Sequence, residues 1–99
     1  MELLTPELRE MLPPLYSQEH EEDPLVICKF FTPDSTWTFF ALEFDGEDLF
    51  FGWVVGFEKE LGYFRLSELA EARGPLGLPI ERDNHFSPTK LSEVMKRHG

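Results

Sequence analysis

Five consecutive polar residues near the C-terminus, Glu81-Arg82-Asp83-Asn84-His85, have side chains of the types that catalysis and metal binding use. If this segment is extended, Glu81 and Asp83 lie on one face and Arg82 on the opposite face. Two carboxylates on one face can divide acid and base roles when their environments separate their pKa values. With His85 as a further ligand or base, the segment predicts a small hydrolase or a metal-dependent enzyme.

The same segment also has a structural interpretation. Arg82 can form a bidentate ion pair with a carboxylate and so fix the loop to a neighbouring sheet. Close pairs of acidic residues arise by chance in a chain that has nineteen Asp and Glu among 99 residues. We favour this structural role, and we assign no catalytic residue.

The sequence contains no familiar cofactor motif. Its three histidines, His20, His85 and His98, stand far apart in the chain and lack the spacing of a zinc site. The segment 74–79 lacks the lysine of a phosphate-binding loop, and its prolines remove amides that would hold phosphate. Cys28 falls in an expected strand, where a thiol behaves as a small apolar side chain. We therefore expect neither a metal nor a cofactor.

Negative charge is concentrated in the first two thirds of the chain, whose formal net charge is -10. Residues 1–24 carry seven acidic and one basic residue, residues 25–66 seven and three, and residues 67–99 five of each. Direct binding to nucleic acid or to an anionic membrane needs a basic face, so we expect neither. A basic protein partner fits this charge, as does imitation of DNA, which carries one charge per about 1.7 Å.

The acidic residues gather in two runs, 19–23 and 43–48, which either keep the protein soluble or meet a partner. The chain also has ten Phe, two Trp and two Tyr, more than a small core readily holds, which predicts an exposed aromatic patch. The candidate binding residues are Glu21, Glu22, Asp23, Trp37, Asp45, Glu47, Asp48, Glu81, Arg82 and Asp83.

Hydrophobic patterning and turn residues predict the elements that position these side chains. Strands are expected over 25–31, 37–44, 49–57 and 62–66, and 80–83 is either a short fifth strand or an extended connector. A turn is expected around Glu60-Leu61-Gly62. We predict one α+β domain over residues 1–99, an antiparallel meander of four or five strands with short N-terminal, middle and C-terminal helices.

Three helix starts are visible in the sequence. Thr5-Pro6 combines a capping side chain with a proline at the first helical position, and Ser87-Pro88 repeats the pattern before the C-terminal helix. Ser67 is expected to cap a middle helix over 68–73, and Gly74 to end it.

One face of the 49–57 strand contains two glycines, Gly52 and Gly56, which leave bare backbone in its middle. Something must approach closely there. We favour a packed helix or a large aromatic side chain from a neighbouring strand, and a ligand floor is the alternative.

Cysteine content and hydropathy suggest where the protein works. With Cys28 as the single cysteine, no intrachain disulfide forms, which fits a reducing cytoplasm. No apolar run approaches 18 residues and the first residues are acidic, so neither a membrane span nor a signal peptide is expected.

Six blocks of sequence stand out together: LPPLYSQE (12–19), KFFTPDSTWT (29–38), EFDGED (43–48), FFGWVVGFEKELGYF (50–64), LSEL (66–69) and RGPLGLPIERD (73–83). With them the chain resembles the family called domain of unknown function 2958, over nearly its whole length. Members of that family are small bacterial proteins or modules of larger ones, often carried by plasmids and other mobile elements. The resemblance implies an accessory role in such an element and supplies no catalytic residues.

These observations lead to one favoured function and two alternatives. We expect a non-enzymatic acidic interaction module of a bacterial mobile element, which binds a protein that handles nucleic acid. The first alternative is a DNA-mimic inhibitor of a host restriction or defence nuclease. The second is the small hydrolase or metal-dependent enzyme centred on Glu81, Asp83 and His85.

Overall fold

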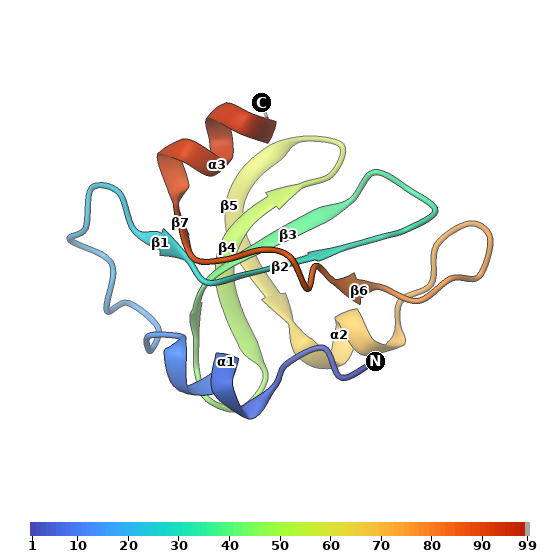
Figure 1. The fold of residues 1–99 in the computed structure, drawn as a ribbon, viewed down its shortest axis with the longest axis horizontal. Coiled ribbons are helices and arrows are strands. Elements are labelled where there is room, and N and C mark those ends of the chain that lie inside the picture. Colours follow the sequence, from blue (N-terminus) through green and yellow to red (C-terminus); the bar gives the residue numbers. More distant parts are fainter. Residues whose placement is uncertain (99) are drawn as a thin grey trace.

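Five antiparallel strands form the central sheet of this protein, whose residues 1–98 are described from a computed structural model (Figure 1). The strand order is β5-β4-β3-β2-β6. The strands are β2 (Cys28–Phe31), β3 (Thr38–Phe44), β4 (Leu49–Val55), β5 (Lys59–Arg65) and β6 (Glu81–Arg82). Strands β2 to β5 make the expected meander. Strand β6 pairs with β2, so the segment 80–83 contains a fifth strand and is not only a connector.

Three short helices and a second, two-stranded sheet complete the fold. The helices are α1 (Pro6–Met11), α2 (Leu66–Glu71) and α3 (Leu91–His98), and the small sheet pairs β1 (Leu25–Val26) with β7 (Thr89–Lys90). The prediction of an α+β fold with helices near both ends and in the middle is confirmed. Within residues 1–98, every helix is too short to cross a membrane.

The first predicted strand, 25–31, is interrupted at Ile27. The Ile27 amide still donates to the carbonyl of Ala41 at 2.9 Å. On the other side of this interruption, β1 pairs with β7 in the small sheet. A separate irregularity lies in the β3–β4 ladder, whose register shifts between Ala41 and Glu43.

The turn between β4 and β5 was predicted too late in the chain. The structure turns at 56–58, where the Gly56 amide donates to the carbonyl of Glu58, and not around Glu60-Leu61-Gly62. Gly62 instead lies opposite Gly52 in the β4–β5 ladder. Gly62, which we took as a turn residue, therefore lies within a strand.

Two of the three predicted helix starts were wrong, while Thr5 caps α1 as expected, accepting from the amide of Leu8 at 3.2 Å. Helix α2 begins at Leu66 without a side-chain cap from Arg65 and ends at Glu71, before Gly74. Helix α3 begins only at Leu91, since the two residues before it form β7.

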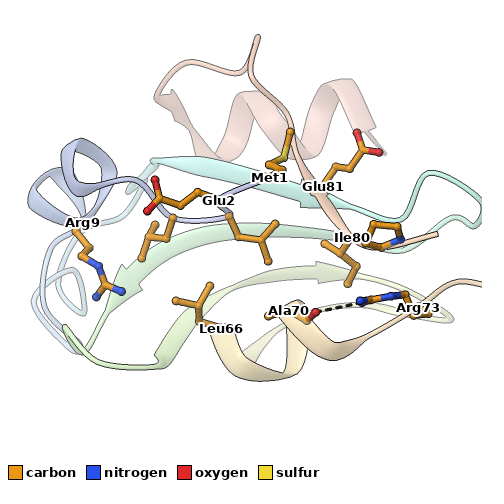
Figure 2. Close-up of a pocket in the computed structure, with 11 residues that line it drawn as sticks. Met1, Glu2, Arg9, Leu66, Ala70, Arg73, Ile80 and Glu81 are labelled. Atoms are coloured by element: carbon orange, nitrogen blue, oxygen red, sulfur yellow. Dashed lines mark hydrogen bonds between the residues drawn. The ribbon is translucent and has the colours of Figure 1, made fainter. Parts of the chain in front are cut away.

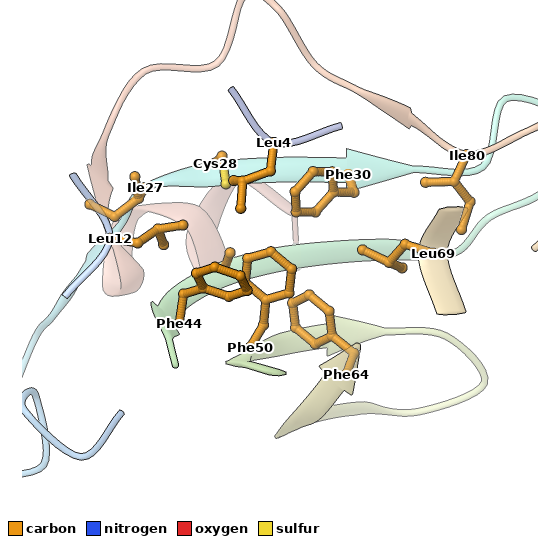
Figure 3. Packing of buried hydrophobic residues seen from close by; sticks show 11 residues of the cluster. Leu4, Leu12, Ile27, Cys28, Phe30, Phe44, Phe50, Phe64, Leu69 and Ile80 are labelled. Carbon is orange, nitrogen blue, oxygen red and sulfur yellow. The ribbon is translucent and has the colours of Figure 1, made fainter. Parts of the chain in front are cut away.

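The sheet buries apolar side chains on both faces. On one face α1, α2 and the N-terminal segment cover a cluster that Figure 3 shows. Its fully or nearly buried members are Leu4, Leu12, Ile27, Cys28, Phe30, Ala41, Phe44, Phe50, Phe64, Leu69 and Ile80. On the other face α3 and Phe86 pack over Val26, Phe40, Leu42, Trp53 and Val55.

Close packing explains the two glycines of β4. A Cβ atom added to Gly56 would lie 2.3 Å from the ring of Trp37, and one added to Gly52 would lie 1.9 Å from the carbonyl oxygen of Phe40. The interpretation that an aromatic side chain from a neighbouring strand fills the gap is confirmed at Gly56. At Gly52 the neighbouring backbone itself occupies the space.

The substitution Gly52→Ala should therefore lower the free energy of unfolding by about 2 kcal/mol or more, because the new methyl group meets rigid backbone. Gly62→Ala is the matched control: Gly62 pairs with Gly52, and a Cβ there meets nothing within 4 Å. We expect the control to change stability by less than about 0.5 kcal/mol in urea unfolding. Equal effects of the two substitutions would contradict this account.

Candidate functional site

Arg82 fixes the C-terminal segment to the N-terminus through carbonyl groups. Its Nη1 donates to the carbonyl oxygens of Glu2 and of Leu3, the latter at 2.9 Å, and its Nη2 donates to Asn84 Oδ1 at 3.1 Å. The prediction that Arg82 forms a bidentate ion pair with a carboxylate was wrong, because its acceptors are two backbone carbonyls and an amide oxygen. The exposed N-terminal carbonyls were nearer than any carboxylate, and the positively charged group satisfies them.

The candidates for the enzymatic alternative share a shallow hollow of about 340 Å³, which Glu81, Asp83 and His85 line together with Lys29. Asp83 is already engaged: its Oδ1 accepts the amide of His85 at 2.9 Å, and its Oδ2 lies 3.6 Å from Lys29 Nζ. Residues 1–98 contain no group of three His, Cys, Asp or Glu placed to hold a metal ion. The arrangement resembles a braced turn more than a catalytic pair.

Two of the candidate acidic residues organise helix starts. Asp48 accepts both the amide and the hydroxyl of Ser67 at 2.8 Å at the start of α2. Asp23 does the same at the start of α3, accepting the amide of Ser92 at 2.8 Å and its hydroxyl at 2.6 Å. Each helix therefore takes its cap from a loop far away in the sequence. Neither helix start needs a local capping residue such as Ser67.

The two acidic runs do not form one continuous row. The run 19–23 ends at the start of α3 and the run 43–48 at the start of α2, and these helices cover opposite faces of the sheet. Asp45 is occupied by the amides of Glu47, Asp48 and Leu49, which lower its pKa. Of the acidic candidates in these runs, Glu21, Glu22 and Glu47 are the exposed side chains without a structural contact in residues 1–98.

Trp37 serves packing. Its ring lies over Gly56, stacks on Phe39 at 6.1 Å and meets Phe57 edge-on at 5.4 Å. The side chain is half-buried. Phe57, which is 95% exposed, is the more available aromatic side chain at this end of the sheet.

A groove of about 400 Å³ lies between the loop 16–24 and the β4–β5 face of the sheet; we call it the acidic groove. Its lining residues are Tyr16, Gln18, Glu19, Glu21, Glu22, Pro24, Leu42, Glu43, Phe51, Leu61, Tyr63 and Leu91. None of these described residues is basic. The groove combines apolar and aromatic walls with four carboxyl groups, a composition that suits a cation carried on an apolar stem.

Glu43 holds the groove's outer loop in place. This side chain is only 4% exposed, and its two oxygens accept the amides of Tyr16 at 2.8 Å and Gln18 at 2.9 Å. Tyr16 has a φ of 69°, a left-handed conformation that costs a non-glycine residue about 1–2 kcal/mol. The bonds to Glu43 offset this strain and keep the Tyr16 ring, 64% exposed, at the mouth of the groove.

Tyr63 faces Tyr16 across the groove. A side-chain hydrogen bond between the two raises the pKa of Tyr63, and the negative charges of Glu43 and Glu19 contribute in the same direction. The phenol of Tyr63 therefore stays protonated at neutral pH. The hydroxyl groups of Tyr16 and Tyr63 can donate or accept hydrogen bonds at the rim, and the ring faces are available to a cation.

Sequence reasoning missed the residues that make the groove, above all Tyr16, Glu43 and Tyr63. One signal was present: Glu43 is a charged residue within the otherwise apolar run FFALEF (39–44), which indicates a buried carboxylate with dedicated partners. No sequence pattern indicated the contact between Tyr16 and Tyr63, because most of the sheet's strands lie between them in the chain.

A hollow of about 810 Å³ lies between the N-terminal segment and α2 (Figure 2). Leu3, Leu66 and Ile80 give it an apolar floor, and its two arginines are occupied by backbone carbonyls. Arg73 donates to the carbonyls of Ala70 and Ala72, and Arg9 to that of Gly46. Glu2 and Glu81 balance these charges, so the hollow shows no preference for an anion or a cation.

Comparison with known proteins identifies a family and no activity. The family model "Protein of unknown function (DUF2958)" matches residues 3–97, so the chain belongs to this family. No curated protein matches this chain. No solved structure matches it either.

The Asp23 cap predicts a pH dependence of stability. The hydrogen bonds from the Ser92 hydroxyl and amide lower the pKa of Asp23 below its ordinary value of 3.8. A carboxyl group whose folded-state pKa is depressed stabilises the fold above the unfolded-state pKa, and the effect is lost as pH falls through the folded-state value. The decrease in the free energy of unfolding caused by Asp23→Ala should be largest at neutral pH and become smaller as pH falls below about 4.

Urea unfolding of both proteins between neutral pH and about pH 3 measures this difference. Glu22→Ala removes the same charge from the next residue and should show no such pH-dependent loss. A stability difference for Asp23→Ala that stays constant over this range would contradict the assignment.

Proposed function

We propose that this protein is a non-enzymatic, acidic interaction module of a bacterial mobile element, working in the cytoplasm on a protein that handles nucleic acid. The acidic groove carries the proposal. Its occupant is an extended basic segment of the partner, with a lysine or arginine side chain between Tyr16, Tyr63 and the carboxylates of Glu19, Glu21 and Glu22. Proteins that bind nucleic acid carry basic segments of this kind.

Charge complementarity supports this occupant. Three exposed carboxylates on one rim attract a cation and speed its approach, and the chain's net charge of -10 adds to the attraction. The apolar wall accommodates the stem of the same side chain, through Phe51 and Leu61. A second copy of this acidic chain would be repelled.

The edge of the sheet beside the groove suits an extended segment. Strand β5 ends the strand order, and in the described part of the chain no further strand pairs with its outer edge. Leu61 and Tyr63, both about half exposed, extend from this strand into the groove. A partner segment that pairs with β5 would place alternate side chains over the groove.

A pull-down from bacterial lysate with paired variants tests the proposal. The groove variant carries Glu19→Gln, Glu21→Gln and Glu22→Gln, and the control variant carries Glu10→Gln, Glu58→Gln and Glu71→Gln, which are exposed and lie outside the groove. We expect wild type and control to retain basic nucleic-acid-handling proteins at low salt, and the groove variant to lose them. Binding of the retained protein should then weaken with salt.

The outcomes separate the competing functions. Equal loss in both triple variants would indicate that total charge matters, as in a DNA mimic, and would contradict a specific groove. Retention that is the same for all three proteins, or no retained nucleic-acid-handling protein, would refute the proposed module.

Tyr16→Gly separates binding from stability. Glycine relieves the left-handed strain at this position, which offsets the lost ring contacts and the larger entropy of the unfolded chain. We expect the free energy of unfolding to stay within about 1 kcal/mol of wild type, while affinity for the retained partner falls several-fold. Tyr16→Phe keeps the ring and should bind more tightly than Tyr16→Gly; equal binding by both would exclude a role for the ring.

A further inference from the structure

Another hollow, of about 400 Å³, lies between β2, the segment 83–89 and α3. We call it the basic hollow. Its lining residues are Lys29, Phe40, Asp83, His85, Phe86, Ser87, Thr89, Val94, Arg97 and His98. Among these described residues the cationic and titratable basic groups outnumber the carboxylates four to one, on a chain whose net charge is strongly negative.

Asp83 is the carboxylate among the lining residues, and it pairs with Lys29. Its Oδ2 lies 3.6 Å from Lys29 Nζ and its Oδ1 accepts the amide of His85, so it fixes the lysine and the turn that carries the histidine. Lys29 also lies over the ring of Phe40 at 5.9 Å, and its side chain is only about one quarter exposed. A positioned ammonium group on a hollow's wall is a suitable partner for an anion.

Arg97 supplies a second cation, on a side chain that is 68% exposed. Its Nε donates to Glu93 Oε1 at 3.2 Å, one helical turn earlier on α3. That bond uses only Nε, and within residues 1–98 no hydrogen bond occupies the two terminal nitrogens. Those nitrogens can bind two oxygens of one phosphate group.

His98 closes the hollow on the sheet side. Its ring meets Phe40 edge-on at 5.3 Å and Trp53 at 6.1 Å. Burial lowers its pKa, and the positive charges of Lys29 on β2 and Lys59 on β5 lower it further. Two positive charges therefore act on this ring, although the whole chain is acidic.

We propose that the basic hollow is a binding site for a phosphate monoester, with the phosphate between Lys29, Arg97 and the two histidines. The hollow is larger than phosphate alone requires, and Phe40, Phe86 and Val94 line it with apolar surface. A small aromatic or apolar group attached to the phosphate fills this remaining space. The basic hollow shares no lining residue with the acidic groove, so this proposal is independent of the proposed function.

Titration with phenyl phosphate, followed by NMR of the histidine Cε1–H signals at constant pH and ionic strength, tests the site. We expect saturable shifts of the His85 and His98 signals, with His20 unaffected as an internal reference. Inorganic phosphate should bind to the same signals more weakly, and phenol should not bind. A negatively charged ligand should also raise the pKa of His98, because it opposes the field of Lys29 and Lys59.

Arg97→Gln should weaken phenyl phosphate binding about tenfold, since it removes charge-assisted hydrogen bonds. Lys96→Gln is the matched control, because it removes the same charge from the preceding residue, which does not line the hollow. Far-UV circular dichroism checks that α3 is intact in both variants. Absence of saturable shifts in wild type, or equal weakening by both substitutions, would overturn the proposal.

Discussion

Carboxylate groups that accept hydrogen bonds from distant backbone amides hold the connecting segments of this protein in place. Asp23 and Asp48 begin α3 and α2 in this way, and Glu43 anchors the loop 16–24. Asp34 accepts the amides of Leu76 and Leu78, and its carboxyl group lies so close to Gly74 that a Cβ there would clash at 1.6 Å. Much of the acidic composition is therefore structural. Charged acceptors make stronger bonds to amides than neutral ones, which suits a small domain with long connections.

The sheet that these segments surround is covered on both faces, which is unusual for a meander of this size. Aromatic rings fill both layers: Phe30, Phe50 and Phe64 meet on the α1–α2 side, and Phe40 and Trp53 stack at 5.5 Å on the α3 side. The high aromatic content is mostly explained by this second layer. Exposed aromatic side chains remain chiefly at the sheet's outer edge and in the β4–β5 turn.

Helix α3 links the two surfaces that we propose to bind ligands. Leu91 at its start lines the acidic groove, while Val94, Arg97 and His98 line the basic hollow. The bonds from Asp23 to Ser92 fix the position of this helix, and so affect both surfaces. The two proposed sites thus lie toward opposite ends of one short helix and are lined by groups of opposite charge.

For 80–83 the sequence left open a short strand or an extended connector, and the pairing with β2 decides between them. The chain's own pattern of apolar, turn and capping residues was enough to predict the α+β class, the meander and the cap of α1 at Thr5. These features depend on contacts between residues that are close in sequence, whose signals are local. The tertiary structure decided the rest. Ser67 was mistaken for a cap because Asp48, nineteen residues away, supplies the bond. The contact of Tyr16 with Tyr63, and the placement of His85 and His98 around one hollow, depend on how the sheet brings distant segments together. No local pattern encodes that arrangement.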